Sequence, residues 1–237
     1  MLILGIDTAA KTASAAVLDL GGDKVLSEMT SNSTGKISHS ENLMPMVDYT
    51  LKCAGVCLSD IDLFAVSRGP GSFTGIRIGI ATAKGLAFGT NINNCLGISS
   101  LCSLAYNFCG LLSDILILPV IDARRKQVYN AVFDGLSLEY IKNDRIITLG
   151  ELESELRREF SGRKIVFAGD GADMCYGEID FDGKMQIPDI LKKPAAASLC
   201  RAAYEEYKKG GQVHPRSLAP AYLIKTQAER EYAEKNK

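Results

Sequence analysis

The residues best suited to chemistry lie in a glycine-rich turn at positions 69–75, Gly-Pro-Gly-Ser-Phe-Thr-Gly. The apolar run 63–66 predicts a short buried strand before this turn, and apolar and small residues at helical spacing follow it to Gly89. A strand, a glycine-rich turn and a helix in this order can present backbone N–H groups to an anion. The same unit can instead be a tight junction that brings the helix close to a sheet or to a partner.

Turns at two strand ends extend the candidate anion site. Asp7-Thr8-Ala9 ends the first predicted strand, and Gly169-Asp170-Gly171 follows a late one. Ligands of α/β proteins bind at such strand ends, whereas hydrogen bonding within the turn is the commoner role of a strand-end aspartate. Both interpretations stay open from the residues alone. The candidate nucleotide or phosphate site comprises Asp7, Thr8, Gly71, Ser72, Gly169 and Gly171.

A serine and a histidine would serve catalysis only in contexts that this sequence lacks. A Ser72 nucleophile in a GxSxG turn needs glycine where Pro70 and Thr74 stand, and the turn does not end in the Gly-Lys-Ser/Thr of a Walker loop. A catalytic metal needs about three protein ligands, and Leu43 occupies the position one helical turn after His39. The sequence therefore predicts no catalytic residue, no metal site and no intrinsic cofactor.

The elements that position these residues follow a repeated order. Strands are predicted at 2–6, 13–18, 24–30, 63–66, 94–98, 115–121, 127–133, 137–142 and 164–168, and helices at 40–54, 75–89, 99–109, 151–160 and 194–208. Ser40 and Ser99 are predicted N-caps. Three strands, a helix, a strand and a helix occur near 1–90 and, less regularly, near 115–207. The sequence predicts an α/β fold with two related lobes.

Small residues are frequent in the helix that follows the turn, among them Gly75, Gly79, Ala81, Ala83 and Gly85. Each interior glycine costs roughly 0.5–1 kcal/mol relative to alanine, so close packing should offset that cost. The helix at 40–54 carries apolar residues on more than one side. Together the two helices predict an interface, in which a bulky residue at 79 or 83 would abolish partner binding while the monomer stays folded.

The composition excludes several classes of protein. The 237 residues are 46% hydrophobic with a formal net charge of −1 and no Trp, which gives no global reason for nucleic-acid binding by this chain alone. Seven cysteines without a CxxC pair indicate free thiols in a reducing compartment. The N-terminus lacks the features of a signal peptide, and no apolar run is long enough to span a membrane, so we expect a cytoplasmic protein.

Five segments resemble the TsaB (YeaZ) family in order and spacing. They are DTA at 7–9, HSENLMP at 39–45, SRGPGSFTGIRIGIATAKGLA at 67–87, PVIDARRKQVY at 119–129 and PAYL at 220–223. The resemblance implies an actin-like, Hsp70-like ATPase (ASKHA) fold of two RNase H-like lobes. These would be residues 1–110, joined by 209–237, and residues 111–208. The family often has Tyr-Leu-Arg where this chain has Tyr222-Leu223-Ile224, and glutamate where it has Gln127.

The family is a non-catalytic scaffold that binds TsaD, the enzyme that forms threonylcarbamoyladenosine at adenosine 37 of tRNAs reading ANN codons. The resemblance also implies regulation by TsaE and contact with tRNA through the complex only. ATP or ADP bound in the assembled complex and a homodimer in isolation, which would use the same helical face, are further expectations. The catalytic paralogue carries two metal-binding histidines four residues apart; His39 aligns with the first, and Leu43 stands at the second. The alternative is a stand-alone nucleotide-binding phosphotransferase or peptidase of the same fold.

The partner interface is expected on the two small-residue and apolar helices. Arg77 and Lys84 are seven residues apart, so they share a helix face and would pair with carboxylates of TsaD. The expected interface residues are His39, Leu43, Met44, Val47, Arg77, Ile80 and Lys84.

Overall fold

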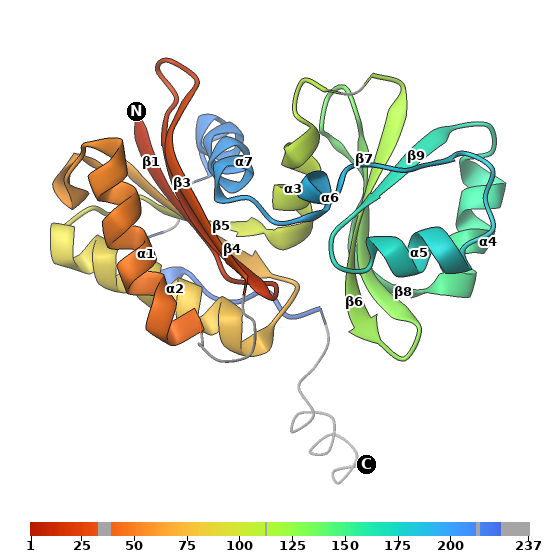
Figure 1. The fold of residues 1–237 in the computed structure, drawn as a ribbon, viewed down its shortest axis with the longest axis horizontal. Helices are drawn as coiled ribbons and strands as arrows, with labels where there is room; N and C mark the ends of the chain where they lie inside the picture. Colours follow the sequence, from red (N-terminus) through yellow and green to blue (C-terminus); the bar gives the residue numbers. More distant parts are fainter. Residues whose placement is uncertain (33–38, 112, 212–213, 224–237) are drawn as a thin grey trace, which may run out of the picture.

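A computed structural model describes residues 1–32, 39–111, 113–211 and 214–223; the side chains of Asn32 and His39 lie outside this description. Two five-stranded sheets lie next to each other, each with helices on its faces (Figure 1). Each sheet begins with an antiparallel three-stranded meander and continues with strands parallel to the first. The predicted α/β class and the repeat of two related lobes are confirmed.

The first sheet has the strand order β3-β2-β1-β4-β5. Its strands are β1 (Leu2–Asp7), β2 (Thr12–Asp19), β3 (Lys24–Asn32), β4 (Leu63–Gly69) and β5 (Cys95–Ser99). Helices α1 (His39–Ala54) and α2 (Phe73–Thr90) cover one face, and α7 (Ala196–Lys208) covers the opposite face. Because both faces are covered, β1 is almost continuously apolar and buried.

The second sheet has the strand order β10-β9-β6-β7-β8. Its strands are β6 (Ile115–Arg124), β7 (Gln127–Asp134), β8 (Tyr140–Thr148), β9 (Lys164–Ala168) and β10 (Lys184–Met185). Helices α4 (Leu149–Glu159) and α5 (Ala172–Glu178) pack on one face, and α3 (Ser100–Ala105) packs on the other. Shorter elements are α6 (Asp189–Lys192) and three 3-10 turns at Leu58–Asp60, Tyr106–Phe108 and Pro215–Ser217.

The expected division into residues 1–110 and 111–208 separates the two sheets but misplaces two helices. Helix α3, expected in the first lobe, packs on the second sheet through Leu101 and Leu104. Helix α7, expected in the second lobe, contacts β1 and β2 of the first sheet. Its buried Leu199 and Cys200 pack with Ile3 and Ala16, so its apolar stripe completes the first core. In the described part of 209–237, Leu218 also belongs to the first core; residues 224–237 lie outside the description.

Several local features differ from the predictions. Strand β8 begins at Tyr140 rather than at residue 137, because the Asp134 carboxylate accepts the amides of Leu136 and Ser137 and closes a turn there. Helix α5 was not predicted, because the sequence after residue 169 resembles a turn alone. Helix α1 begins at His39, one residue before the predicted cap.

Ser99 is confirmed as an N-cap and also joins the lobes. Its Oγ accepts the amides of Leu101 and Cys102 at 3.1 and 3.3 Å and donates to Asp144 Oδ2 of β8 at 2.5 Å. Burial raises the pKa of Asp144, and hydrogen bonds from Ser99 and Tyr140 oppose this shift. Ser99 of the first lobe thus hydrogen-bonds the half-buried carboxylate of Asp144 in the second lobe.

We expect Asp144→Asn to remove a pH-dependent loss of stability. Because the pKa of Asp144 is higher in the folded chain, the folded state binds its proton more tightly. This contribution to stability is full at low pH and is lost as pH rises from the ordinary aspartate value through the raised one. Urea unfolding at about pH 3 and about pH 7.5, below and above this range, should therefore show the variant gaining stability relative to wild type at the higher pH.

Asp134→Asn is the matched control with the opposite sign. The pKa of Asp134 is lowered, mainly by the hydrogen bond from the Ser137 amide. Wild type should therefore become more stable relative to this variant as pH rises through the ordinary aspartate range. Equal pH profiles for wild type and Asp144→Asn would contradict the prediction.

Candidate functional site

The end of β1 is held by a network of buried side chains. Ser67 Oγ donates to Asp7 Oδ1 at 2.8 Å, and the Ala9 amide donates to the same oxygen at 3.0 Å. Thr8 Oγ1 donates to the Gly75 carbonyl at 2.7 Å. Asp7, Thr8 and Ser67 are all at most 1% exposed. The aspartate therefore organises its own turn, which was the commoner of the two roles considered.

The glycine-rich turn packs against this strand end. Gly71 has a φ of +150°, and a Cβ there would lie 2.3 Å from the Ala9 carbonyl oxygen. The Ser72 amide donates to the same oxygen at 2.7 Å, and Ser72 Oγ caps α2 by accepting the Gly75 amide at 3.2 Å. An anion bound at this turn would need these two amides as donors. Both already donate to oxygens of the protein.

The second lobe repeats this arrangement at Gly169 and Gly171. Gly169 has a φ of +109°, and a Cβ there would lie 2.1 Å from the Val120 carbonyl oxygen. Its amide donates to the Lys192 carbonyl at 2.9 Å, and the Gly171 amide donates to Val120 at 3.2 Å. In both lobes the glycines allow a close approach of two backbone segments.

A cavity of about 340 Å³ adjoins the two turns, lined by residues 10–12 of the first lobe and by Gly169 and Asp170 of the second. Lys192 at its wall pairs with Asp173 at 2.7 Å and Asp189 at 2.9 Å, and these carboxylates raise its pKa. Within the described chain, no group of three or more His, Cys, Asp or Glu side chains is positioned to hold a metal ion. Lys192 is therefore engaged by carboxylates of the second lobe, and Lys11 and Lys193 also line the cavity.

The structure buries three of the expected interface residues. Leu43 and Val47 of α1 and Ile80 of α2 are 1%, 2% and 5% exposed in the first core. Their helical spacing marks the inward stripe, so they stabilise the fold and present no surface to a partner. Met44 and Arg77 are exposed. The side chain of His39 is outside the described set.

The small residues of α2 also face inward, contrary to the hypothesis that they meet a partner. A Cβ at Gly75 would lie 2.0 Å from the Thr8 carbonyl oxygen, and a Cβ at Gly79 would lie 2.4 Å from Thr8 Oγ1. Ala83 is fully buried. The close packing that offsets these glycines is that of α2 on its own sheet.

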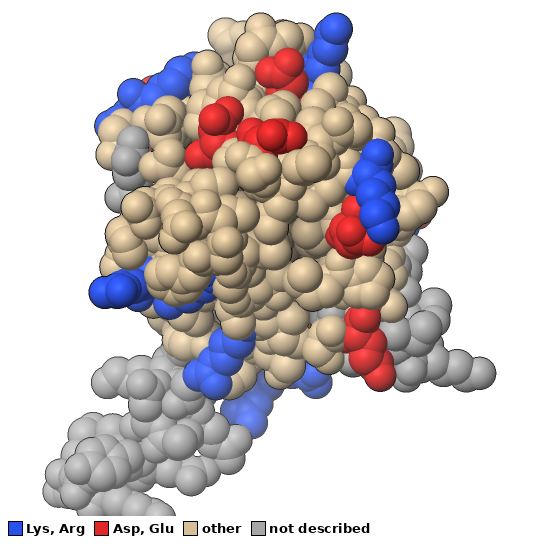
Figure 2. Space-filling view, turned by 90° about the vertical axis from the view of Figure 1, so that its left-hand side faces the viewer, with Lys and Arg blue, Asp and Glu red and all other residues tan. Residues whose placement is uncertain are grey.

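The exposed sides of α1 and α2 form a different surface, here called the α1–α2 face. Large apolar side chains stand out on it, with 43–56% of their area exposed: Met44, Tyr49, Phe73 and Phe88. Charged residues share the exposed side of α1, where Asp48 and Lys52 pair at 2.6 Å. Figure 2 shows the left-hand side of Figure 1, where charged side chains lie around a mostly uncharged middle and an acidic group lies above it. Sequence analysis missed Phe73 and Phe88, although their positions off the apolar stripe were the available signal. Such a surface is typical of an interaction site.

Among the described helices, none combines the length and apolarity needed to cross a bilayer.

Comparisons with known proteins identify relatives along nearly the whole chain. A family model described as TsaD, tRNA N6-adenosine threonylcarbamoyltransferase, matches residues 24–232. The tRNA threonylcarbamoyladenosine biosynthesis protein TsaB of Escherichia coli (strain K12) is 30% identical over 226 residues, covering 94% of each chain. The Bacillus subtilis (strain 168) protein of the same name is 32% identical over 251 residues and covers both chains fully. The solved structure of YeaZ from Pseudomonas aeruginosa has a TM-score of 0.75 at 26% identity, over 94% of this chain and 99% of that one.

These similarities extend across both lobes. The ASKHA fold class that the resemblance implies is confirmed by the repeated sheet topology and the YeaZ structure. The chain belongs to the TsaB (YeaZ) family.

Proposed function

We propose that this chain is a non-catalytic subunit that binds a TsaD-type transferase and is required for threonylcarbamoyladenosine formation on tRNA. The observation that carries the proposal is the α1–α2 face, where Met44, Tyr49, Phe73 and Phe88 are exposed on adjacent helices. Exposed aromatic and methionine side chains are enriched in the cores of protein interfaces. The names of the full-length relatives supply the process.

The absence of catalysis is supported by the state of the candidate site. Amides at Ser72, Gly75, Gly169 and Gly171 donate to protein oxygens. Leu43, at the position of a second metal ligand, is buried in the core. The chemistry therefore belongs to the partner, which shares enough with this chain for a TsaD family model to match it.

The same proposal extends to the remaining partners. This chain binds no nucleotide of its own; ATP or ADP enters with the assembled complex, and TsaE acts on that complex in the cytoplasm. The tRNA is contacted through the complex. In isolation, a second copy of the chain occupies the α1–α2 face.

Reconstitution with purified transferase, tRNA and threonylcarbamoyl-adenylate tests the function. We expect modification only when this chain is present, and we expect Met44→Asp to abolish both complex formation and modification, because it places a charge in an apolar contact. Leu136→Asp is the matched control: Leu136 is 75% exposed, but on the second lobe, so complex formation should be unchanged.

Two results would contradict the proposal. One is modification by the transferase at the same rate without this chain. The other is hydrolysis of ATP or a peptide by this chain alone, which is the outcome expected of a stand-alone enzyme.

A further inference from the structure

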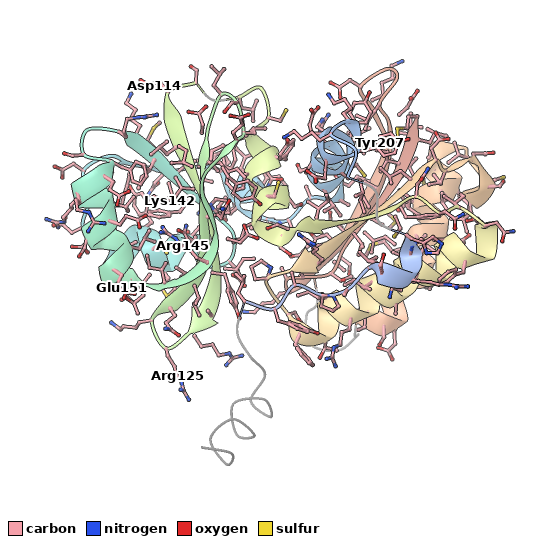
Figure 3. The ribbon with its side chains drawn as sticks, turned by 180° about the vertical axis from the view of Figure 1, so that it is seen from behind. Asp114, Arg125, Lys142, Arg145, Glu151 and Tyr207 are labelled. Atoms are coloured by element: carbon pink, nitrogen blue, oxygen red, sulfur yellow. The ribbon has the colours of Figure 1, made fainter. Side chains whose placement is uncertain are left out.

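The end of the described chain, residues 214–223, runs along the outside of α2 (Figure 3). Leu218 anchors it, since its side chain is 3% exposed within the first core. The Ala221 amide donates to the Arg68 carbonyl at 2.8 Å. These contacts fix the position at which the next residue meets α2.

Tyr222 meets Arg77 and Phe73 at the N-terminal end of α2. Arg77 Nε donates to the Tyr222 hydroxyl at 2.8 Å, and Arg77 Cζ lies 3.8 Å from the centroid of the Phe73 ring. The two rings stack with centroids 5.1 Å apart and planes 25° apart. The three side chains, here called the Arg77 clamp, hold one guanidinium in a fixed orientation.

The clamp holds a charge that the described chain leaves without an opposite one. No described Asp or Glu forms an ion pair with Arg77, whereas Lys52 on α1 pairs with Asp48. Its Nε is occupied by Tyr222, and stacking on Phe73 covers one flat side of the guanidinium. The two terminal nitrogens at the outer edge of the guanidinium can still donate two parallel hydrogen bonds to a carboxylate.

We propose that the Arg77 clamp is the specificity-determining anchor of the α1–α2 face and binds an Asp or Glu side chain of the transferase subunit. The inference rests on the proposed function and adds the chemistry of the contact. Holding Arg77 in place before binding lowers the entropy lost when the ion pair forms. Arginine and tyrosine surrounded by apolar contacts are also typical of binding hot spots.

A carboxylate is favoured over an RNA phosphate by the surroundings of the clamp. Interfaces with nucleic acid are strongly basic, whereas the exposed neighbours on this face are Met44, Tyr49 and Phe88. Lys84, the other cation expected to reach a partner, donates instead to the Arg216 carbonyl at 3.4 Å. Lys52, a further cation on this face, is paired with Asp48, so the face is not basic overall and its Arg77 guanidinium matches one carboxylate of a protein.

Calorimetric titration of the transferase subunit with variants of the full chain tests the proposal. We expect Arg77→Gln to weaken the Kd by about 30-fold or more, as for a hot-spot residue. Tyr222→Phe keeps the ring stack but removes one hydrogen bond, and we expect a loss of about three- to tenfold. Lys126→Gln removes an equal charge on the second lobe, where Lys126 pairs with Glu178 at 3.1 Å, and should change the Kd less than about twofold. Unchanged urea midpoints confirm that the variants fold.

Neutralising each acidic side chain of the transferase in turn then identifies the partner group. The matching Asp→Asn or Glu→Gln variant should weaken binding to wild type but not to Arg77→Gln, as a double-mutant cycle requires. Binding of Arg77→Gln within about twofold of wild type would overturn the clamp while leaving the proposed function intact. So would a defect confined to self-association or to tRNA binding by a preformed complex. No binding of wild type to the transferase would overturn both.

Discussion

Gly75→Ala is expected to destabilise the folded chain by about 3 kcal/mol or more, although it adds a single methyl group. The new Cβ would lie 2.0 Å from the Thr8 carbonyl oxygen. That oxygen cannot easily move, because two hydrogen bonds fix Thr8: its Oγ1 donates to the Gly75 carbonyl at 2.7 Å, and its amide donates to Ser67 Oγ at 3.4 Å. Helix α2 would have to lift from its sheet. Urea unfolding followed by circular dichroism measures the loss.

Gly85→Ala is the matched control in the same helix. A Cβ at Gly85 has no neighbour within 4 Å, so alanine should stabilise the chain by about 0.5–1 kcal/mol through helix propensity alone. If both variants shift the midpoint in the same direction, the inward orientation of the α2 glycines is wrong. A folded Gly75→Ala variant that loses only partner binding would restore the interface hypothesis derived from sequence.

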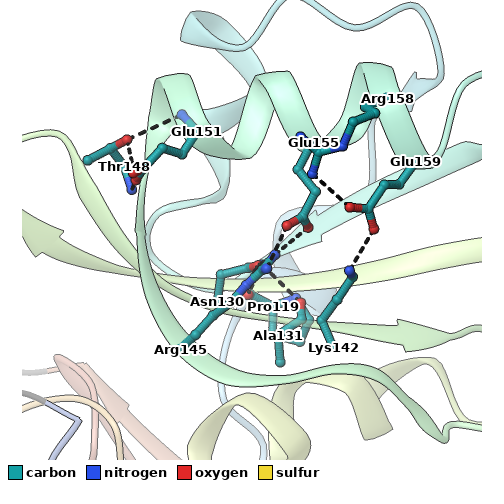
Figure 4. A network of polar contacts seen from close by, with 10 residues as sticks. All are labelled: Pro119, Asn130, Ala131, Lys142, Arg145, Thr148, Glu151, Glu155, Arg158 and Glu159. Carbon is teal, nitrogen blue, oxygen red and sulfur yellow. Dashed lines mark hydrogen bonds and ion pairs between the residues drawn. The ribbon is translucent and has the colours of Figure 1, made fainter.

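Arg145→Leu is expected to cost about 3–5 kcal/mol in the second lobe. The Arg145 guanidinium binds both oxygens of Glu155 on α4, at 2.7 and 2.6 Å, and donates to Asn130 Oδ1 at 3.0 Å (Figure 4). The side chains of Arg145 and Glu155 are only 25% and 11% exposed. Removing the cation leaves a largely buried carboxylate without its counter-charge. The free energy of unfolding in urea is the measurement.

Two further variants distinguish the loss of this ion pair from the loss of side-chain volume. Lys142 and Glu159 join the same strand and helix by one contact of 2.6 Å, with each side chain 32% exposed. Lys142→Leu should leave the unfolding midpoint nearly unchanged, because Glu159 keeps a second counter-charge in Arg158 at 2.8 Å and partly exposed pairs contribute little. The double variant Arg145→Leu, Glu155→Leu should recover most of the loss, since apolar groups can replace a buried pair. A double variant as unstable as Arg145→Leu would contradict this account.

Periodicity and turn residues predicted most of the local structure. The strand at Lys164–Ala168 has the predicted bounds, and Ser99 caps α3 as expected. These features depend on neighbours in sequence: alternating burial, a hydroxyl before a helix, and glycine where the backbone turns. The same local rules predicted that the α2 glycines pack closely against something.

What they pack against was not predictable from one chain. A small residue allows another surface to come close to the helix but does not show which surface that is. From sequence alone, Gly79 is therefore as compatible with contact to a partner as with contact to its own sheet. Leu43 and Val47 were placed on a stripe, yet its direction depends on the tertiary fold. Arg77 was expected at the interface, but its contacts with Phe73 and Tyr222 were missed, because Tyr222 lies 145 residues away in sequence.

The return of α7 to the first sheet affects the order in which the chain can fold during synthesis. The second sheet is complete once residues 115–185 have left the ribosome. The first sheet begins at Leu2, but Ile3 and Leu63 on one of its faces stay uncovered until α7 emerges, more than a hundred residues later. The half that is translated first should therefore become stable last, and during elongation that apolar face is the part of the nascent chain most exposed to chaperones.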